Sequence, residues 1–352
     1  MKNTLSLLFC VLFCATTLAG QSQKDSKPNI KVVAEEGNPN FIHCCLENVN
    51  TLANAKVTWT AKGNDVHQGT AAVFYFERKG TYKVKVFVTT SSKTYSVDTK
   101  VKIADDSQYF KRGEKLVWSD EFSGNVVDTL KWAYNLGTGR WGGNELQEYT
   151  SSIENAFIRD GSLVIKTIRR GEGSKVGDYT SARLVTRGHC EINRGRVEVR
   201  AKMPGVKGTQ PAIWLYGRNA APNYSEIDIM EYVAYDRHRV YGTVHPSATL
   251  AKPKEEPCKN EGYIQMDDIE STFHIYGMNL SESQVDIYVD EPLSPYLTFT
   301  PAEKENPRFW PFQSTMYIIL NNAVGRPWAA RHGIDFNAFP CEMEIDYVRV
   351  FQ

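Results

Sequence analysis

The sequence lacks the patterns that mark zinc-binding, nucleic-acid-binding and membrane-spanning proteins. No two of its seven cysteines are separated by two residues, and none forms a zinc-type spacing with a histidine. Its 352 residues include 41 basic and 41 acidic side chains, so the formal net charge is zero. Because Lys and Arg are scattered, no nucleic-acid partner and no anionic membrane surface are expected. Internal repeats are absent, and no long segment has a helical period.

The longest apolar run lies at the N-terminus and is too short to span a bilayer, so no transmembrane segment is expected. Lys2 supplies charge, residues 5–18 are largely apolar, and two small residues follow. This order is typical of an export signal, so residues 1–20 are predicted to be a signal peptide of a periplasmic, cell-surface or secreted protein. A lipid anchor on Cys14 is the alternative, although Phe13 stands where lipoprotein signals carry a small residue.

The cysteines beyond the signal are odd in number: Cys44, Cys45, Cys190, Cys258 and Cys341. At least one thiol is therefore free or paired between chains. Export permits disulfides, but the spacing leaves the pairing open. A structural role is expected for these cysteines, because they do not form a metal-binding pattern.

Short segments of alternating polarity fill residues 28–104. Residues 56–60 (Lys-Val-Thr-Trp-Thr) alternate with period two, and so do residues 82–88 and 95–103. Turn residues such as Gly-Asn-Asp at 63–65 separate these segments. Regular short strands with alternating faces predict an antiparallel β-sandwich for this first module.

Residues 104–108 (Ala-Asp-Asp-Ser-Gln) are polar and are expected to link this module to a second one at 112–352. In that second module the chain again has the pattern of strand after strand. The clearest predicted strands are 162–167, 194–202, 285–289, 316–320 and 343–351. So many strands in one stretch predict one large β-sandwich or barrel, and therefore an all-β chain.

The strongest chemical signal is a strand that starts at residue 225, with the sequence Ser-Glu-Ile-Asp-Ile-Met-Glu-Tyr. Side chains of a regular strand alternate between faces, so Glu226 and Asp228 share one face. Glu231 is an odd number of residues away from both, so on a regular strand it would lie on the other face. A β-bulge at Ile229 or Met230 would bring all three carboxylates to one side, and bulges often re-aim a side chain next to an active site.

Three acids on one sheet face suit acid/base chemistry. Like charges raise one another's pKa and keep one group protonated near neutrality. Retaining glycoside hydrolysis uses two carboxyl groups about 5–5.5 Å apart, one attacking the anomeric carbon and one protonating the leaving oxygen. Aromatic residues make up 12 % of the chain, and several lie among polar residues, where they either pack at sheet edges or stack on sugar rings. The alternative interpretation is an acidic strand face that pairs with surface cations.

The second module resembles glycoside hydrolase family 16, the laminarinase-like glucanases and galactanases, over residues 116–352. The resemblance rests on markers in order along the chain. They are Trp-Ser-Asp-Glu-Phe at 118–122, Trp-Gly-Gly-Asn-Glu-Leu-Gln at 141–147, Tyr-Thr-Ser-Ala-Arg at 179–183, Pro-Ala-Ile-Trp-Leu at 211–215, the carboxylate strand, Phe-His-Ile-Tyr at 273–276 and Glu-Ile-Asp-Tyr-Val-Arg-Val at 344–350. The family fold is a jelly roll of two curved sheets with a cleft on the concave face, which agrees with the predicted strands.

The resemblance implies a role for each matching residue. Glu226 matches the nucleophile, Glu231 the acid/base, and Asp228 the residue that hydrogen-bonds the nucleophile. Positions that contact sugars on the non-reducing side are matched by Asn144, Arg183 and Trp214, with Trp141 in the same marker as Asn144, and His245 matches a histidine near the acid/base. As alternatives, Trp214 is part of the core, Arg183 is a surface charge and His245 is structural. Three further histidines are expected to be structural: His189, His238 and His274.

Two further features come from resemblance. Family members often carry a structural calcium, for which Asp346 and the carbonyl of Gly161 would be ligands, and oxygen ligands suit calcium. Asp346 could instead pair with a neighbouring cation. Residues 80–86 (Gly-Thr-Tyr-Lys-Val-Lys-Val) resemble a strand of polycystic-kidney-disease-type immunoglobulin-like modules, although the usual Gly-Asp-Gly turn is absent. Such a module would be a spacer or a glycan-binding domain.

Departures from the family pattern bear on the substrate. Many laminarinases have Trp-Pro just before the carboxylate strand, whereas this chain has Ala-Pro-Asn-Tyr, so a stacking platform is lost unless Tyr224 replaces it. Residues 252–258 are charged and unlike the glucanase pattern. The expected activity is an exported, monomeric endo-hydrolase of β-1,3- or mixed-linkage glucan that needs no cofactor for catalysis. A β-1,4-galactosidase acting on poly-N-acetyllactosamine or mucin glycans is the alternative, and a non-catalytic glycan-binding protein is a third hypothesis.

Overall fold

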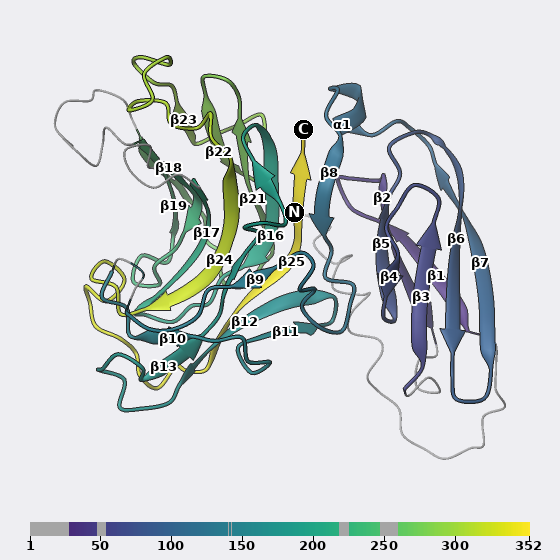
Figure 1. Ribbon diagram of the computed structural model, residues 1–352, viewed down its shortest axis with the longest axis horizontal. Coiled ribbons are helices and arrows are strands. Elements are labelled where there is room, and N and C mark those ends of the chain that lie inside the picture. The colour runs from purple at the N-terminus through teal and green to yellow at the C-terminus, as the bar shows by residue number, and fades with distance from the viewer. Residues whose placement is uncertain (1–27, 48–53, 140, 142, 218–224, 247–259) are drawn as a thin grey trace. The chain divides into compact units, whose positions relative to one another are not determined.

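The computed structural model describes residues 28–47, 54–139, 141, 143–217, 225–246 and 260–352, and about half of the chain forms β-strands (Figure 1). One short helix lies among the described residues, α1 (Gln108–Lys111). By its contacts the chain divides into two compact units, Met1–Lys115 with Ser123–Asn125 and Leu116–Phe122 with Val126–Gln352. The predicted all-β class is confirmed, and no described helix is long and apolar enough to cross a membrane.

Some sequence predictions concern residues outside the described part of the chain. These are the signal peptide at 1–20 with the lipid-anchor alternative at Cys14, the loop at 252–258 with Cys258, and Tyr224. Among the described cysteines, Cys44, Cys190 and Cys341 are free thiols, and Cys44 and Cys341 are buried. Their burial fits the structural role expected from the sequence.

Two sheets make up the N-terminal unit. Its three-stranded sheet has the order β1 (Asn29–Ala34), β2 (Phe41–Glu47), β5 (Ala71–Tyr75). Its four-stranded sheet has the order β4 (His67–Gln68), β3 (Lys56–Ala61), β6 (Gly80–Thr89), β7 (Thr94–Ile103). Buried residues from both sheets form one apolar cluster, so the unit has a core of its own.

The period-two alternation predicted for this unit is present in its strands. Val57 and Trp59 on β3 are buried, as are Val84 and Val86 on β6, while the residues between them are more exposed. Trp59 is the largest of these side chains, and its indole Nε1 donates a hydrogen bond to the carbonyl of Gly69 at 2.8 Å. Because that is the only polar atom of the indole, the ring can be fully buried without an unsatisfied donor.

The larger sheet of the C-terminal unit has ten strands. Its order is β10 (Gln147–Tyr149), β13 (Tyr179–Ser181), β12 (Ser162–Arg169), β25 (Cys341–Phe351), β16 (Gly195–Lys202), β21 (His274–Leu280), β22 (Val285–Val289), β23 (Leu297–Phe299), with β11 (Ala156–Arg159) beside β12 and β8 (Leu116–Asp120) beside β25. Four strands predicted from the sequence, at 162–167, 194–202, 285–289 and 343–351, correspond to β12, β16, β22 and β25.

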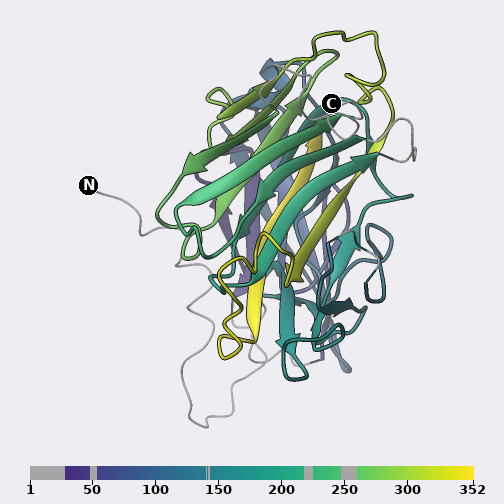
Figure 2. The same ribbon diagram turned by 90° about the vertical axis from the view of Figure 1, so that its left-hand side faces the viewer.

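The second sheet of this unit has eight strands, and Figure 2 looks onto it. Its order is β20 (Glu261–Gln265), β19 (Arg239–Pro246), β18 (Ser225–Glu231), β17 (Thr209–Gly217), β24 (Met316–Val324), β14 (Arg183–Val185), β9 (Ala133–Tyr134), with β15 (Glu191–Ile192) beside β24. Strand β24 corresponds to the strand predicted at 316–320. The carboxylate strand β18 therefore lies inside a sheet, with β17 and β19 as its neighbours.

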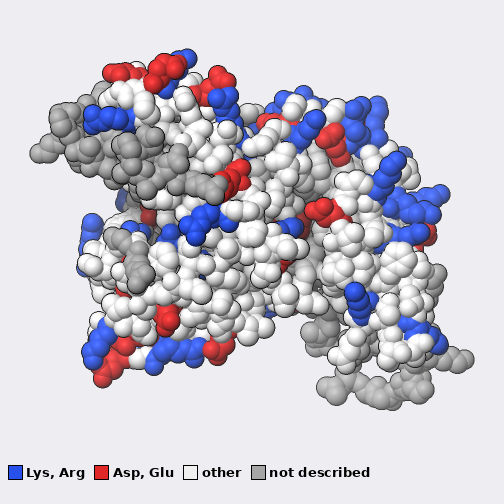
Figure 3. Space-filling model, viewed as in Figure 1, with Lys and Arg blue, Asp and Glu red and all other residues white. Residues whose placement is uncertain are grey.

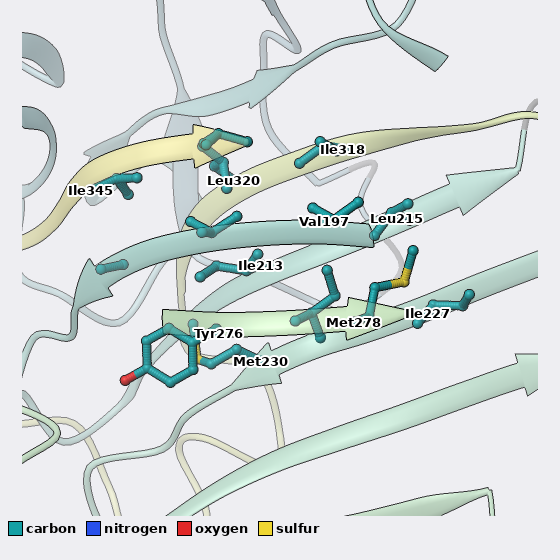
Figure 4. Close-up of a cluster of buried hydrophobic side chains, with 14 of the residues drawn as sticks. Val197, Ile213, Leu215, Ile227, Met230, Tyr276, Met278, Ile318, Leu320 and Ile345 are labelled. Carbon is teal, nitrogen blue, oxygen red and sulfur yellow. The ribbon is translucent and has the colours of Figure 1, made fainter. Parts of the chain in front are cut away.

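One apolar core lies between these two sheets. Figure 4 shows part of it, with Ile213, Leu215, Ile227 and Met230 of the eight-stranded sheet close to residues of the ten-stranded sheet. The labelled partners on the ten-stranded sheet are Val197, Tyr276, Met278 and Ile345. All of these side chains are fully buried. Since one face of each sheet is committed to this core, the opposite face of the eight-stranded sheet is left to form a binding surface.

Charges of both signs are mixed on the surface. On the face shown in Figure 3, acidic and basic side chains are interspersed over the C-terminal unit. Exposed pairs such as Arg194 with Glu282 (Nη1 to Oε1, 2.5 Å) are typical. Each such pair is worth about 0–1 kcal/mol, so these contacts contribute little to stability.

A buried ion pair joins β25 to the residue that follows β8. Arg349 has no exposed surface, and its guanidinium donates two hydrogen bonds to the Glu121 carboxylate, from Nε at 2.9 Å and from Nη2 at 2.8 Å. The Tyr347 ring centroid lies 3.5 Å from Cζ of Arg349. Bidentate geometry of this kind is what a buried guanidinium needs to offset its loss of hydration.

Replacing Glu121 by Ala should leave the Arg349 charge buried and unpaired. We expect the free energy of unfolding of the C-terminal unit to fall by about 3–5 kcal/mol. Urea unfolding of the whole chain, followed by tryptophan fluorescence, measures the change. The control is Lys304→Ala, which removes an exposed side chain 3.9 Å from Glu305 and should cost less than about 0.5 kcal/mol. Equal effects of the two substitutions would contradict this role of the buried pair.

Candidate active site

Strand β18 contains the bulge that the spacing of its acids predicts. Against β17, Asp228 and Met230 lie opposite adjacent residues, so Ile229 has no direct partner. The register against β19 is shifted at the same place, between Asp228 and Glu231. Two residues of one strand opposite one residue of its neighbour define a β-bulge.

The bulge sorts the side chains of β18 onto two faces. Ile227, Ile229 and Met230 are all fully buried in the core between the sheets. Glu231, next in sequence to Met230, lines the hollow on the opposite face together with Glu226 and Asp228. We call the face that carries these three carboxylates the cleft face. Without the extra residue, strict alternation would have directed Glu231 into the core.

A hydroxyl from another part of the chain supports the bulge from the core side. The Tyr296 hydroxyl donates a hydrogen bond to the carbonyl of Ile229 at 3.4 Å. Gly242 of β19 leaves room for this contact, because a Cβ at that position would lie 2.5 Å from the same hydroxyl. A buried carbonyl that the bulge removes from the strand ladder thus has a partner.

Two adjoining hollows lie over the carboxylates, and together we call them the cleft. Both are lined by Gln210, Glu226, Asp228, Glu231 and Arg326. The more enclosed hollow, about 190 Å³, is also lined by Trp141, Glu145, Tyr149, Arg183, Ala212, Trp214, Asn321 and Ala323. The wider hollow, about 490 Å³, is also lined by Gly143, Asn144, His245, Pro327 and Trp328. Aromatic rings therefore flank the carboxylates in both hollows.

An amide holds the Glu231 carboxyl. Gln210 Nε2 donates a hydrogen bond to Oε1 of Glu231 at 2.6 Å. Burial raises the pKa of Glu231, the Gln210 hydrogen bond and the Arg326 charge lower it, and the Glu226 charge raises it again. The net pKa lies above that of an ordinary glutamate, so Glu231 keeps its proton to a higher pH than an exposed carboxyl does.

Asp228 and His245 form a pair on adjacent strands. Nε2 of His245 lies 3.0 Å from Oδ2 of Asp228. Burial acts to lower the His245 pKa, but the hydrogen bond and charge of Asp228, with Glu226 and Glu231, outweigh it and raise the pKa to about 9. Burial and the neighbouring glutamates raise the pKa of Asp228, and His245 opposes them. The pair therefore holds one proton jointly near neutral pH.

Arg183 lies between two aromatic rings in the enclosed hollow. Its Cζ is 4.6 Å from the Trp141 ring centroid and 4.7 Å from the Trp214 ring centroid. Trp214 is fixed by a hydrogen bond from Nε1 to Oδ1 of Asn321 at 2.7 Å. Burial lowers the pKa of Arg183, yet guanidinium groups stay charged at any physiological pH. Arg183 is buried rather than a surface charge, and Trp214 lines the cleft while also packing against the buried residues Val185, Tyr317 and Ile319.

The structure gathers most of the predicted site residues in one place. Glu226, Asp228 and Glu231 share the cleft with Asn144, Arg183, Trp141, Trp214 and His245. Asn144 lines the wider hollow and has a positive φ of 55°, which asparagine tolerates better than most residues.

Several further cleft residues were not singled out from the sequence, among them Gln210, Glu145, Arg326 and Trp328. Gln210 follows from alternation, since it lies two and four positions before Ala212 and Trp214 on the same strand. Arg326 and Trp328 follow β24 in a loop, and their position over the carboxylates depends on pairing of strands far apart in sequence. Glu145, which pairs with Arg326 (Nε to Oε1, 3.5 Å), stood inside a family marker but was not assigned a role.

The predicted calcium ligands lie away from the cleft, on the ten-stranded sheet. Strands β12 and β25 pair with Leu163 opposite Ile345, which places the turn at Gly161 close to Asp346 in register. The Asp346 carboxylate is already engaged by Arg200, whose Nη1 lies 2.5 Å from Oδ2. A cation at Asp346 would therefore have to displace or share this guanidinium.

Within the described residues, one group of acidic and histidine side chains is compact enough to hold a metal ion. It consists of Glu226, Asp228 and His245, with potential ligand atoms within 4.8 Å of one another. Metal ligation requires a neutral imidazole. Because the pKa of His245 is raised to about 9, its imidazolium would have to lose a proton before it could ligate a metal near neutral pH.

A curved β-sandwich whose cleft holds three clustered carboxylates and flanking aromatic rings defines a carbohydrate-active site. The chain belongs to glycosyl hydrolases family 16, whose model matches residues 144–349. It is 39 % identical over 250 residues to a beta-glucanase of Rhodothermus marinus, which covers 68 % of this chain and 85 % of that one. The solved laminarinase of the same organism superposes with a TM-score of 0.61 at 39 % identity, covering 68 % of this chain and 97 % of that one.

A relative with a different printed activity is also similar. The keratan-sulfate endo-1,4-beta-galactosidase of Sphingobacterium multivorum is 32 % identical over 250 residues, covering 68 % of this chain and 55 % of that one. The predictions of a family 16 glycoside hydrolase and of its jelly-roll fold are confirmed by these comparisons.

Replacing His245 by Asn removes a positive charge that lowers the pKa of both Asp228 and Glu231. The basic limb of the pH profile of kcat/KM, which reports loss of the proton on Glu231, should therefore move to higher pH. We expect kcat/KM at the optimum to fall about 10–100-fold, since a hydrogen bond between charged groups is lost. The profile is measured with a soluble substrate between pH 4 and about 10. His189→Asn, an exposed histidine in the turn after β14, is the control, and an unshifted profile for His245→Asn would contradict the charge argument.

Proposed function

We propose that this chain is a retaining endo-hydrolase of β-1,3- or mixed-linkage glucan. The observation that carries the proposal is the bulge in β18, which places Glu226, Asp228 and Glu231 together on the cleft face. As formed by the described residues, the wider hollow is open to solvent, so a polymer can enter it at an internal position. Arrays of this kind supply the two carboxyl groups of double displacement.

In the first step Glu226 attacks the anomeric carbon. The electron pair of the glycosidic bond moves to the leaving oxygen, which takes the proton of Glu231. In the second step a water molecule gives a proton to Glu231, and its oxygen forms a bond to the anomeric carbon as the ester to Glu226 breaks. Glu231 suits this dual role because burial raises its pKa while Gln210 and Arg326 limit the rise.

Asp228 and His245 adjust the charge and orientation of the catalytic groups and form no covalent bond with the sugar. Asp228 lies between the two glutamates on β18, and His245 lies opposite Glu226 across the β18–β19 ladder. The imidazolium offsets part of the negative charge that Glu226 must carry before attack. We assign Asp228 to hydrogen-bonding the nucleophile and orienting it.

The enclosed hollow holds the sugars on the non-reducing side. Trp214 and Trp141 offer ring surface for stacking, and Arg183 offers N–H donors for sugar hydroxyls. Asn144 adds an amide at the edge of the wider hollow. We assign Tyr224, which lies outside the described residues, to the same groove as a replacement for the absent Trp.

The substrate follows from the relatives. A beta-glucanase and a laminarinase are similar to this chain over the whole catalytic unit, which favours β-1,3-glucan. A second candidate, β-1,4-galactosidic glycans such as poly-N-acetyllactosamine, is favoured by the similarity to a keratan-sulfate endo-1,4-beta-galactosidase. The replaced Trp-Pro pair before β18 points the same way.

The remaining parts of the chain complete the proposal. We propose export through the signal at 1–20, action as a monomer, and a spacer or glycan-binding role for an immunoglobulin-like module at 28–104, with the catalytic domain at 112–352. The two compact units and the separate core of the first support this division. No cofactor takes part in the proposed reaction.

A structural calcium at Asp346 and Gly161 is proposed as an addition to the fold, outside the reaction. Calcium would replace Arg200 as the partner of Asp346 and would bind the Gly161 carbonyl. Adding calcium to chelator-treated protein should then raise its Tm, and the rise should increase with the calcium concentration. The Asp346→Asn variant serves as the control and should lose this response. A Tm that calcium leaves unchanged in the wild type would remove the site.

Glu226→Gln should abolish hydrolysis while leaving the fold intact. We expect release of reducing ends from laminarin to fall at least about 1000-fold, because the nucleophile is lost. Glu282→Gln, an exposed acid outside the cleft, is the matched control and should retain full activity. In the wild type, proton NMR of the first product should show the β-anomer.

Several outcomes would overturn parts of the proposal. Wild-type protein that releases no reducing ends from laminarin or lichenan excludes the glucan, and release from keratan-type glycans then supports the second candidate. An α-anomer as first product excludes retention. If Glu226→Gln and wild type bind glycan alike and neither cleaves any polysaccharide, the chain is a glycan-binding protein.

A further inference from the structure

The cleft face continues past the carboxylates onto β19 and β20. Tyr241 of β19 lies directly opposite Glu231, and Tyr263 of β20 lies directly opposite Tyr241. Residues paired across a ladder point to the same face of a sheet. Both tyrosines therefore project on the cleft face, in one row with Glu231, and this row ends at the edge strand of the sheet.

Burial along the two strands agrees with this placement. On β19, Val240 and Val244 are buried in the core while Tyr241 between them is half-buried. On β20, Ile264 packs against the core, whereas the Tyr263 side chain next to it is 51 % exposed. Tyr263 is thus one of the large apolar side chains that the fold leaves in solvent, and it lies two strands from Glu231, in the same row as Tyr241.

Contacts among the described residues hold the rings in position, and none of Tyr241, Tyr263 and Trp328 is fully buried by those residues. The Tyr241 hydroxyl donates a hydrogen bond to Oδ2 of Asp236 at 2.5 Å, which fixes the ring over its strand. The Trp328 ring centroid lies 5.1 Å from that of Tyr241, edge to face, and the Tyr263 ring centroid lies 6.0 Å from that of Tyr241. Cζ of Arg239 lies 4.7 Å from the Tyr263 ring centroid, so a cation backs one ring face.

The chemistry of the reaction says which sugars reach this row. Glu231 protonates the oxygen of the leaving group, so the first leaving sugar lies beside Glu231. In the proposed reaction the sugar that Glu226 attacks occupies the enclosed hollow, whose lining residues Ala212 and Trp214 belong to β17, on the opposite side of β18 from β19. Leaving sugars therefore extend from Glu231 toward Tyr241 and Tyr263.

We propose that Tyr241 and Tyr263, with Trp328, form a stacking platform for the β-linked hexoses on the leaving-group side of the scissile bond. The proposal rests on the proposed retaining hydrolysis and adds a binding subsite to it. Pyranose rings present C–H faces that pack on aromatic rings, and an exposed ring at a sheet edge can accept them without rearrangement. The platform also provides a binding subsite for an acceptor sugar, which competes with water to react with the glycosyl-enzyme.

The test compares two substrates that differ only on the leaving-group side. One is the polymer that the wild type cleaves, and the other is an oligosaccharide of the same linkage with 4-nitrophenol as its leaving group. For Tyr263→Ala, we expect the ratio of kcat/KM on the polymer to kcat/KM on the aryl oligosaccharide to fall about 3–10-fold. Tyr263→Phe keeps the ring and should keep the ratio. Phe336→Ala, an exposed aromatic outside the cleft lining, is the matched control.

A second measurement follows the acceptor. With added oligosaccharide, the wild type should form transfer products, in which an acceptor hydroxyl gives its proton to Glu231 and its oxygen bonds the anomeric carbon as the ester to Glu226 breaks. Tyr263→Ala should form fewer of them at the same acceptor concentration.

The outcomes separate this inference from the proposed function. If the wild type cleaves neither substrate, the proposed function fails. Suppose that the wild type cleaves both substrates and that Tyr263→Ala leaves the ratio of kcat/KM values and the amount of transfer products unchanged. The stacking platform is then wrong, while the proposed hydrolase function is retained. A proportional loss on both substrates would place Tyr263 on the other side of the scissile bond and would also overturn the inference. A wild-type Tm for Tyr263→Ala shows that the fold is unchanged.

Discussion

The extra residue in β18 is the constraint on which the site depends. A side-chain period of two cannot place residues 226, 228 and 231 on one face, so one ladder position has to be given up. Burial of Ile229 and Met230 in the core offsets that loss. The Tyr296 hydroxyl donates a hydrogen bond to the carbonyl of Ile229, which the bulge has displaced from the strand ladder. Gly242 is required by the same geometry, because any larger residue would collide with that hydroxyl. A catalytic arrangement is thus secured from the core side of the sheet.

Once the acids share a face, their charges must be balanced. Burial raises the pKa values of Asp228 and Glu231, and the charges of neighbouring carboxylates raise them further. Gln210 and Arg326 lower the pKa of Glu231, and His245 lowers that of Asp228. The cations come from outside β18, so each can bias one carboxyl more than another. This unequal bias is what lets one acid keep a proton while another stays ionised.

The sequence was sufficient for features governed by local periodicity, and less so for features that depend on distant strands. Acid spacing alone predicted the bulge, and alternation predicted the strands of both units. Tyr296 could not be found in this way, because it reaches Ile229 from 67 residues along the chain. The same applies to Arg200, which is 146 residues from Asp346 and occupies the carboxylate assigned to calcium. Gln210 is an intermediate case, since period two from Trp214 places it on the cleft face.

The two sides of the cleft differ in a way that suits double displacement. Toward β14 the hollow is enclosed, and Arg183 is fixed between two indoles, so a sugar bound there is held by oriented donors. Toward β20 the proposed platform is exposed, and its rings offer contact area with few fixed hydrogen-bond donors. In the proposed reaction the sugars on the first side remain attached to Glu226 after the bond breaks, whereas those on the second side must leave before water can enter. Firm binding on one side and exchangeable stacking on the other therefore follow from the order of the two steps, because leaving sugars held as firmly as the glycosyl group would delay turnover.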